Sequence, residues 1–105
     1  MAWIYILVAA VFEISWAIGL KYSEGFTNLR ASIFTVITMI LSYIFLAMGV
    51  KYIPVGTAYA VWTGIGAVGV AIYGMFFFNE SKDVLRIIFI LLIVTGVIGL
   101  RLTSK

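Results

Sequence analysis

Four long apolar stretches alternate with short polar segments along this chain of 105 residues. The apolar stretches cover residues 2–20, 31–50, 58–78 and 84–102. Each has about the 20 residues that an α-helix needs to cross roughly 30 Å of hydrocarbon. Because backbone polar groups inside a bilayer must be hydrogen-bonded within the segment, stretches of this kind form helices. The pattern therefore predicts an all-α integral membrane protein, a single domain over residues 1–105 with four short transmembrane helices.

The composition supports a membrane protein and excludes several kinds of chemistry. Hydrophobic residues make up 65% of the chain and charged residues 10%, whereas a soluble domain has about 25% charged residues. The chain has no Cys and no His, which excludes disulfides, thiolate or imidazole metal sites and His-based acid–base catalysis. We therefore expect no metal, no cofactor and no enzymatic activity. The net charge of +3 is spread over the loops and does not indicate a nucleic-acid partner.

The basic residues are divided almost equally between the two predicted sides of the membrane. Three of them lie on the side of both termini and four on the other side. A difference of one charge hardly specifies an orientation by the positive-inside rule. Either another signal decides the orientation, or the chain inserts both ways. Insertion both ways would allow an antiparallel, dual-topology homodimer, whose two copies form an inverted repeat as in alternating-access transporters. The small size also favours an oligomer, since four helices enclose little space.

Glu13 is the one charged residue in the middle of an apolar stretch, and the next charge along the chain, Lys21, lies two helical turns away. An acidic side chain at mid-span faces a bundle interior or a cavity and marks a functional site by default. A carboxyl group at this depth can hold a proton in one condition and bind a cation in another. The alternative is a permanently protonated Glu13 that joins helices through hydrogen bonds.

Two polar side chains lie at about the same depth as Glu13. Trp16 shares its helix face, so that its Nε1–H could orient the carboxylate and its ring could cover a bound cation. Trp16 is too deep in the span for the alternative, an interfacial anchor. Ser42, in the second stretch, could donate a hydrogen bond to the carboxylate or to a ligand, or equally to a carbonyl of its own helix.

The third and fourth stretches carry small residues at positions suited to movement and association. Tyr59, Trp62 and Gly66 follow i, i+3, i+7 spacing on one face of the third, and Gly64 and Gly66 make its middle easy to bend. We interpret them as part of a binding site and a conformational hinge; the alternative is static packing of small residues. The fourth stretch carries a seam of small residues at Thr95, Gly96 and Gly99. Such a seam suits self-association, although the motif is weak by itself.

The chain resembles the small multidrug resistance family over essentially its whole length, and within it the guanidinium-exporter subtype. The resemblance is carried by the membrane Glu13, by "GLKYSEGF" after it and by "PVGTAYAVWTGIGAVG" in the third stretch. The Trp in "EISWAIGLKY" is typical of the guanidinium exporters, because the polyspecific drug exporters usually carry a small residue there.

The resemblance implies an antiparallel homodimer in a bacterial inner membrane that exchanges guanidinium for protons. The two copies of Glu13 are then the central carboxylates, and Gly64 to Gly66 form the bend of the third helix. The resemblance also implies a polar and aromatic surround made of Trp16, Ser42, Tyr59 and Trp62.

Three other functions remain open. A promiscuous exporter of hydrophobic quaternary ammonium compounds would depend on aromatic walls and tolerate the loss of Ser42, because these cations lack N–H donors. The chain could also be one half of a heterodimer that moves lipid-linked sugars or polyamines. A third alternative, from another class, is a non-transporting membrane scaffold in which Glu13 is structural.

Overall fold

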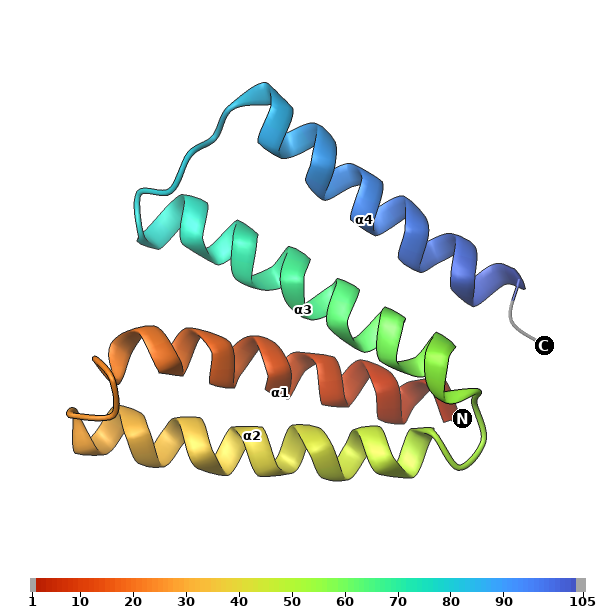
Figure 1. The fold of residues 1–105 in the computed structure, drawn as a ribbon, viewed down its shortest axis with the longest axis horizontal. Helices are drawn as coiled ribbons and strands as arrows, with labels where there is room; N and C mark the ends of the chain where they lie inside the picture. Colours follow the sequence, from red (N-terminus) through yellow and green to blue (C-terminus); the bar gives the residue numbers. More distant parts are fainter. Residues whose placement is uncertain (1, 104–105) are drawn as a thin grey trace.

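The computed structural model describes residues 2–103, which form four helices joined by short turns (Figure 1). These helices are α1 (Ala2–Tyr22), α2 (Leu29–Gly49), α3 (Val55–Phe77) and α4 (Val84–Thr103). Each has between 20 and 23 residues and is long and apolar enough to cross a membrane. The predicted all-α membrane architecture is therefore confirmed, with one helix on each apolar stretch.

Six of the eight helix ends differ from the predicted boundaries by one to three residues, and the starts of α1 and α4 coincide with them. The longest shift is at α3, which begins at Val55, directly after Pro54, rather than at residue 58. At α2, Asn28 caps the helix because its side chain accepts a hydrogen bond of 3.2 Å from the Ala31 N–H. Hydropathy marks where a chain enters the lipid, whereas helices continue into polar residues until a cap or turn ends them.

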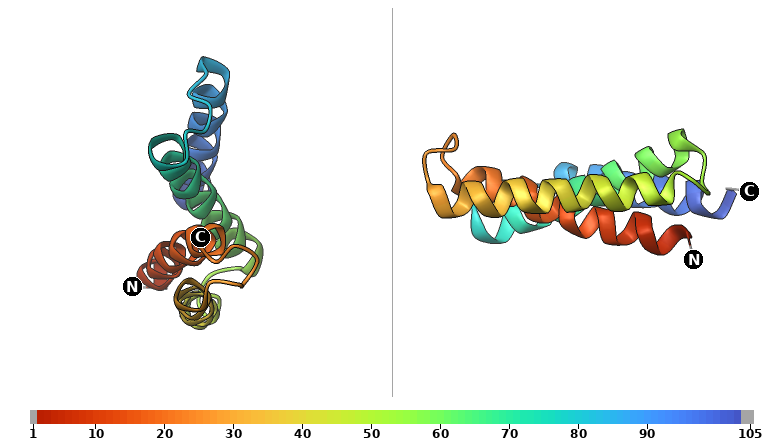
Figure 2. Two further views of the ribbon diagram at one scale, coloured as in Figure 1. Left: turned by 90° about the vertical axis from the view of Figure 1, so that its left-hand side faces the viewer. Right: turned by 90° about the horizontal axis from the view of Figure 1, so that it is seen from below.

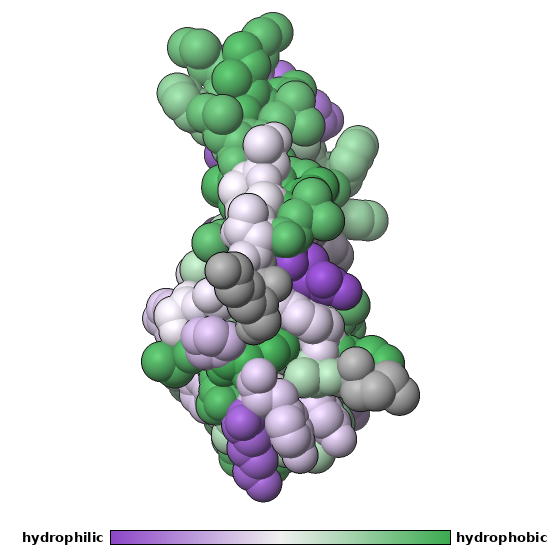
Figure 3. All heavy atoms as spheres, turned by 90° about the vertical axis from the view of Figure 1, so that its right-hand side faces the viewer, coloured by the Kyte–Doolittle hydropathy of each residue, from purple (hydrophilic) through white to green (hydrophobic). Residues whose placement is uncertain are grey.

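The four helices lie in one thin layer in the order α2, α1, α3, α4 (Figures 1 and 2). The described chain measures 43 × 35 × 17 Å. The start of α1, the end of α4 and the α2–α3 turn lie at one end of this layer (Figure 1). No described residue of α4 is buried, and Figure 3 shows hydrophobic side chains over the part of the surface where α4 lies. A single chain thus forms an open layer rather than a closed bundle.

Small residues let α1 and α2 approach closely at both ends of their contact. Gly19 of α1 faces Thr35 of α2, and Gly49 of α2 faces Ile6 of α1. Ile6 is fully buried. A Cβ atom at Gly49 would meet the Ile6 Cδ1 methyl group and lie 3.0 Å from its Cγ1. The α1–α2 pair is therefore the most tightly packed part of the chain.

We expect Gly49→Ala to lower the free energy of unfolding by about 1–3 kcal/mol, because extra atoms in a well-packed contact force the neighbouring side chains out of place. Ile6 cannot move aside, since it is fully buried. Thermal unfolding in detergent measures the effect. Adding Ile6→Val removes the Cδ1 methyl group and should restore most of the lost stability. No destabilisation by Gly49→Ala would contradict the close contact.

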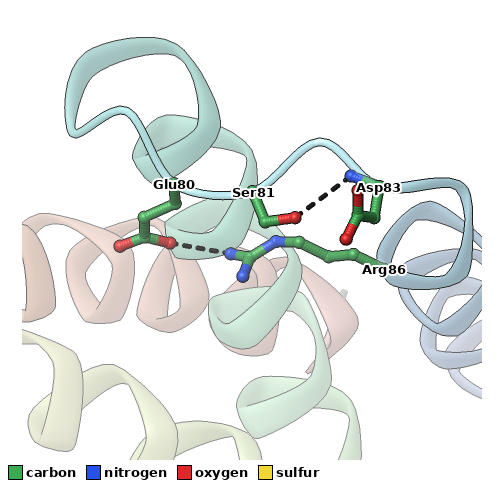
Figure 4. A network of polar contacts seen from close by, with 4 residues as sticks. All are labelled: Glu80, Ser81, Asp83 and Arg86. Carbon is green, nitrogen blue, oxygen red and sulfur yellow. Dashed lines mark hydrogen bonds and ion pairs between the residues drawn. The ribbon is translucent and has the colours of Figure 1, made fainter.

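The α3–α4 turn folds back on the end of α3 (Figure 4). The Gly74 carbonyl accepts hydrogen bonds from the N–H groups of Phe78, at 3.0 Å, and Glu80, at 3.1 Å. The Glu80 carboxylate lies against Gly74, where a Cβ atom would collide with it. Arg86 of α4 donates a hydrogen bond of 2.7 Å from Nη2 to Glu80 Oε1. Because both side chains are partly exposed, this ion pair orients the turn more than it stabilises the fold.

Candidate functional site

Glu13 lies at the middle of α1, and its carboxylate is directed against Gly66 of α3. A Cβ atom at Gly66 would meet Glu13 Oε1 and Cδ, and would lie 3.0 Å from Cγ. The glycine therefore provides the space that the carboxylate occupies. Within residues 2–103, the buried Oε1 atom has no hydrogen-bond partner. The same range contains no group of three or more side chains that could hold a metal ion.

Trp16 lies one turn further along α1, and its indole N–H is also unpaired. Its Nε1 atom is buried without a hydrogen-bond partner in the described part of the chain. A bond from Trp16 to Glu13, which their shared helix face would allow, is thus not formed within one chain. The Trp16 ring packs instead against the ring of Tyr43 of α2, with ring centroids 6.5 Å apart. Two polar atoms of α1, one turn apart, are therefore buried without partners.

Within the chain, Ser42 donates to neither of the two protein groups considered for it, the Glu13 carboxylate and a carbonyl of its own helix. Its hydroxyl donates a hydrogen bond of 2.7 Å to the Ala9 carbonyl of α1, not to Glu13 and not to its own helix. The same hydroxyl oxygen accepts a bond of 3.0 Å from Trp62 Nε1. Trp62 Nε1 also lies 3.3 Å from the Ala9 carbonyl oxygen. The cause is the close α1–α2 packing at the small Ala9, which brings a carbonyl with a free lone pair within reach of Ser42.

This cluster, made of Ala9, Ser42 and Trp62, ties three helices together close to Glu13. Ala9 and Ser42 are fully buried, and Trp62 is 4% exposed. By helix geometry, the Ala9 carbonyl also accepts the backbone N–H of Glu13, four residues on. Every member is satisfied, so the cluster fixes the relative positions of α1, α2 and α3. Ala9 could not be found from the sequence, since it contributes only a backbone carbonyl.

Aromatic rings form a continuous row from α1 across α2 to α3. Trp16 contacts Tyr43, whose ring centroid lies 5.7 Å from that of Trp62. Tyr59 follows, with its centroid 5.4 Å from Trp62. Tyr59 is 56% exposed, so the row ends at the surface of the layer. The structure thus brings Trp16, Tyr59 and Trp62 into one aromatic row and adds Tyr43 to it.

The residues of the predicted hinge lie within α3, and those of the predicted dimer seam lie on α4. The α3 helix runs unbroken through Gly64 and Gly66. A Cβ atom at Gly64 would lie 2.5 Å from Val97 Cγ2 of α4, so Gly64 permits close helix packing. On α4, an added Cβ at Gly96 or Gly99 would meet no atom within 4 Å. The Thr95 hydroxyl donates to the Leu91 carbonyl of its own helix.

Comparison with known proteins identifies the family. The profile of the family described as Small Multidrug Resistance protein matches residues 1–93. A protein of Proteus vulgaris named "Guanidinium exporter" is 52% identical over 99% of this chain and 100% of its own length. Proteins of the same name are 53% identical in Yersinia pseudotuberculosis and 51% identical in Escherichia coli, each over 99% of this chain and at least 99% of their own length. The chain therefore belongs to the Small Multidrug Resistance family of multi-pass membrane proteins.

Proposed function

We propose that this protein is a proton-coupled antiporter that exports guanidinium across a bacterial inner membrane, and that it works as an antiparallel homodimer. The observation that carries the proposal is the Glu13 carboxylate, held at mid-membrane against Gly66 with Oε1 buried and unpaired within the described chain. The relatives named as guanidinium exporters, about half identical over their full length, indicate the cation. Small substituted guanidinyl cations are further candidate substrates.

Guanidinium suits a buried carboxylate for two reasons. It is a planar cation whose N–H donors match the two oxygens of a carboxylate bidentately. It is also more weakly hydrated than an ammonium group, so that less free energy is needed to bring it out of water. Buried polar atoms in folded proteins nearly always have a hydrogen-bond partner. An N–H donor of guanidinium would supply the one that Glu13 Oε1 lacks within residues 2–103.

The open layer supports a site made by two copies of the chain. One chain is 17 Å thick along its shortest dimension, and the row of Trp16, Tyr43, Trp62 and Tyr59 ends at an exposed ring. A second copy would bring its own Glu13 opposite the first and close the site. The unpaired Trp16 Nε1 would then have a ligand or the partner's carboxylate within reach. In the antiparallel arrangement, the two copies form an inverted repeat, the architecture of transporters whose site opens to one side of the membrane at a time.

Competition for the carboxylate oxygens couples the two fluxes. A protonated Glu13 has lost the negative charge that attracts guanidinium, and a bound guanidinium stabilises the ionised carboxylate and so disfavours its protonation. Each ligand therefore displaces the other, and the gradient of one drives the transport of the other. If two protons enter for each guanidinium that leaves, one net charge moves inward, worth about 2.3 kcal/mol per 100 mV.

Proton movement into proteoliposomes that contain only this protein tests the proposal. We expect an imposed guanidinium gradient to drive protons in the opposite direction, because the two cations exchange at Glu13. A pH-sensitive dye inside the vesicles follows the flux, and protein-free vesicles give the background. Flux with this one chain would also exclude an obligate second subunit, as in a heterodimer. A rate of guanidinium transport that depends on neither pH nor voltage would contradict the coupling.

A quaternary ammonium compound in the same vesicles separates the second candidate function. Such cations lack N–H donors and would rely on the aromatic row rather than on bidentate bonds to Glu13. Proton flux with a quaternary ammonium compound and none with guanidinium would identify a multidrug exporter. No flux with either cation would favour the scaffold or a missing partner subunit.

A further inference from the structure

A groove runs between α3 and α4 on a side of the layer that the proposed transport site does not use. Two adjoining hollows, of about 230 and 180 Å³, share Ile65, Val97 and Ile98 as lining residues. Other side chains along the groove are also apolar, among them Leu7, Val61 and Val94. From Val94 to Arg101 the groove extends about 10 Å along α4, at 1.5 Å per residue.

One basic side chain, Arg101, lies at the end of the groove near the membrane surface. Arg101 lies in the last turn of α4, and its guanidinium carbon lies 4.9 Å from the ring centroid of Trp3. Both residues line the same end of the groove. Among residues 2–103 the only ion pair joins Arg86 to Glu80, so Arg101 has no carboxylate partner there. Trp and Arg together at a helix end are typical of the lipid headgroup region.

We infer that this groove binds an anionic phospholipid, with one acyl chain in the apolar part and the phosphate on Arg101. The groove is lined by apolar side chains along its length and has a positive charge at one end. It therefore matches an anionic phospholipid, which has an apolar acyl chain and a negatively charged phosphate at one end. Basic pockets between transmembrane helices are known to bind anionic headgroups. Stacking on Trp3 holds the guanidinium at the mouth of the groove, where its outer N–H donors are free to bind phosphate oxygens bidentately.

The helix faces argue against a second copy of the chain as the occupant. Successive residues of an α-helix are turned by about 100°. On α4 the proposed dimer seam at Thr95, Gly96 and Gly99 therefore lies on the side opposite to Val97 and Arg101. On α1 the groove is lined by Leu7 and Ile14, which lie about a third of a turn from Glu13 and nearly half a turn from Trp16 by the same geometry. A homodimer formed through the seam and the Glu13 site would leave the groove facing lipid.

Native mass spectrometry of the purified protein, titrated with phosphatidylglycerol or phosphatidylcholine of identical acyl chains, tests the inference. We expect phosphatidylglycerol to bind about fivefold more tightly, the effect of one basic residue on an anionic headgroup. Arg101→Gln should abolish this preference. Lys51→Gln is the matched control, because Lys51 is an exposed cation at the same end of the layer, outside the groove. A preference that survives Arg101→Gln, or disappears equally in Lys51→Gln, would overturn the assignment.

A second variant tests the acyl chain separately from the charge. Ile98→Trp places a large side chain in the groove, and we expect it to reduce the binding of both lipids. The same spectra report the oligomeric state, so a variant that loses the dimer but keeps its lipid would show that the groove is a protein interface. Displacement of phosphatidylglycerol by millimolar inorganic phosphate would mean that Arg101 binds a free anion instead. Neither readout depends on guanidinium transport.

Discussion

Glu13→Gln should abolish guanidinium-driven proton flux and weaken guanidinium binding about 30-fold or more. The amide keeps the size of the side chain but carries no negative charge and cannot exchange a proton. Removing one partner of a buried, hydrogen-bonded charge pair costs about 2–5 kcal/mol, and each 1.4 kcal/mol is a factor of ten in affinity. The flux assay in proteoliposomes and a binding titration of the purified protein measure the two effects independently.

Two variants make the Glu13 result specific. Glu24→Gln removes an acidic side chain in the exposed α1–α2 turn and should leave both flux and binding unchanged. Glu13→Asp retains a carboxyl group and should keep some pH-dependent flux. Normal flux in Glu13→Gln would show that Glu13 only joins helices. An equal loss in Glu24→Gln would show that the assay reports overall charge rather than this site.

Gly66→Ala should weaken guanidinium binding at least tenfold while the chain still folds. The added methyl group would occupy the position of Glu13 Oε1 and Cδ, so the carboxylate must move. A displacement of about 1 Å from the productive geometry can reduce activity by 10²-fold. Alanine itself is favourable in a helix interior, and any loss therefore reflects the collision. A guanidinium titration together with thermal unfolding separates lost affinity from lost stability.

Gly69→Ala is the matched control for this collision. It lies on α3 three residues from Gly66, and its Cβ atom would meet Ile14 rather than Glu13. We expect Gly69→Ala to cost stability through overpacking but to spare guanidinium affinity in the folded fraction. Equal losses of affinity in both variants would mean that α3 simply tolerates no added bulk. An unchanged affinity in Gly66→Ala would show that Glu13 binds its ligand away from Gly66.

The helices were predictable because each apolar stretch has the length that the bilayer requires. Their ends were less so, since polar residues such as Lys21 and Tyr22 extend α1 beyond the lipid-like stretch. The arrangement in one layer could not be predicted at all. It depends on where glycines permit contact between helices, as at Gly49 and Ile6, and hydropathy does not contain this information.

The candidate site residues could be named one by one from the sequence, but their bonds could not. A carboxylate alone in an apolar stretch identifies Glu13 from charge and depth, and spacing identifies Trp62 on the same face as Gly66. The partner that Ser42 has within the chain was not among the alternatives considered for it, because its acceptor is the backbone carbonyl of Ala9 on another helix. Any residue can supply a carbonyl, so no letter in the sequence marks it. The role of Gly66 as the wall behind Glu13 likewise appears only when α1 and α3 are packed together.

Because α1 and α2 pack together more closely than the other helices, we expect this pair to assemble in the membrane before α3 joins it. The α1–α2 contact is made between neighbours in the chain and is secured by small residues at Gly19 and Gly49, so this hairpin can assemble while the ribosome is still synthesising α3. The residue against which the Glu13 carboxylate packs, Gly66, belongs to α3. Until α3 arrives, the nascent hairpin therefore exposes its carboxyl group to lipid or to the insertion machinery. Because a charged side chain is costly in lipid, we expect Glu13 to enter the membrane with its proton on, before any transport cycle begins.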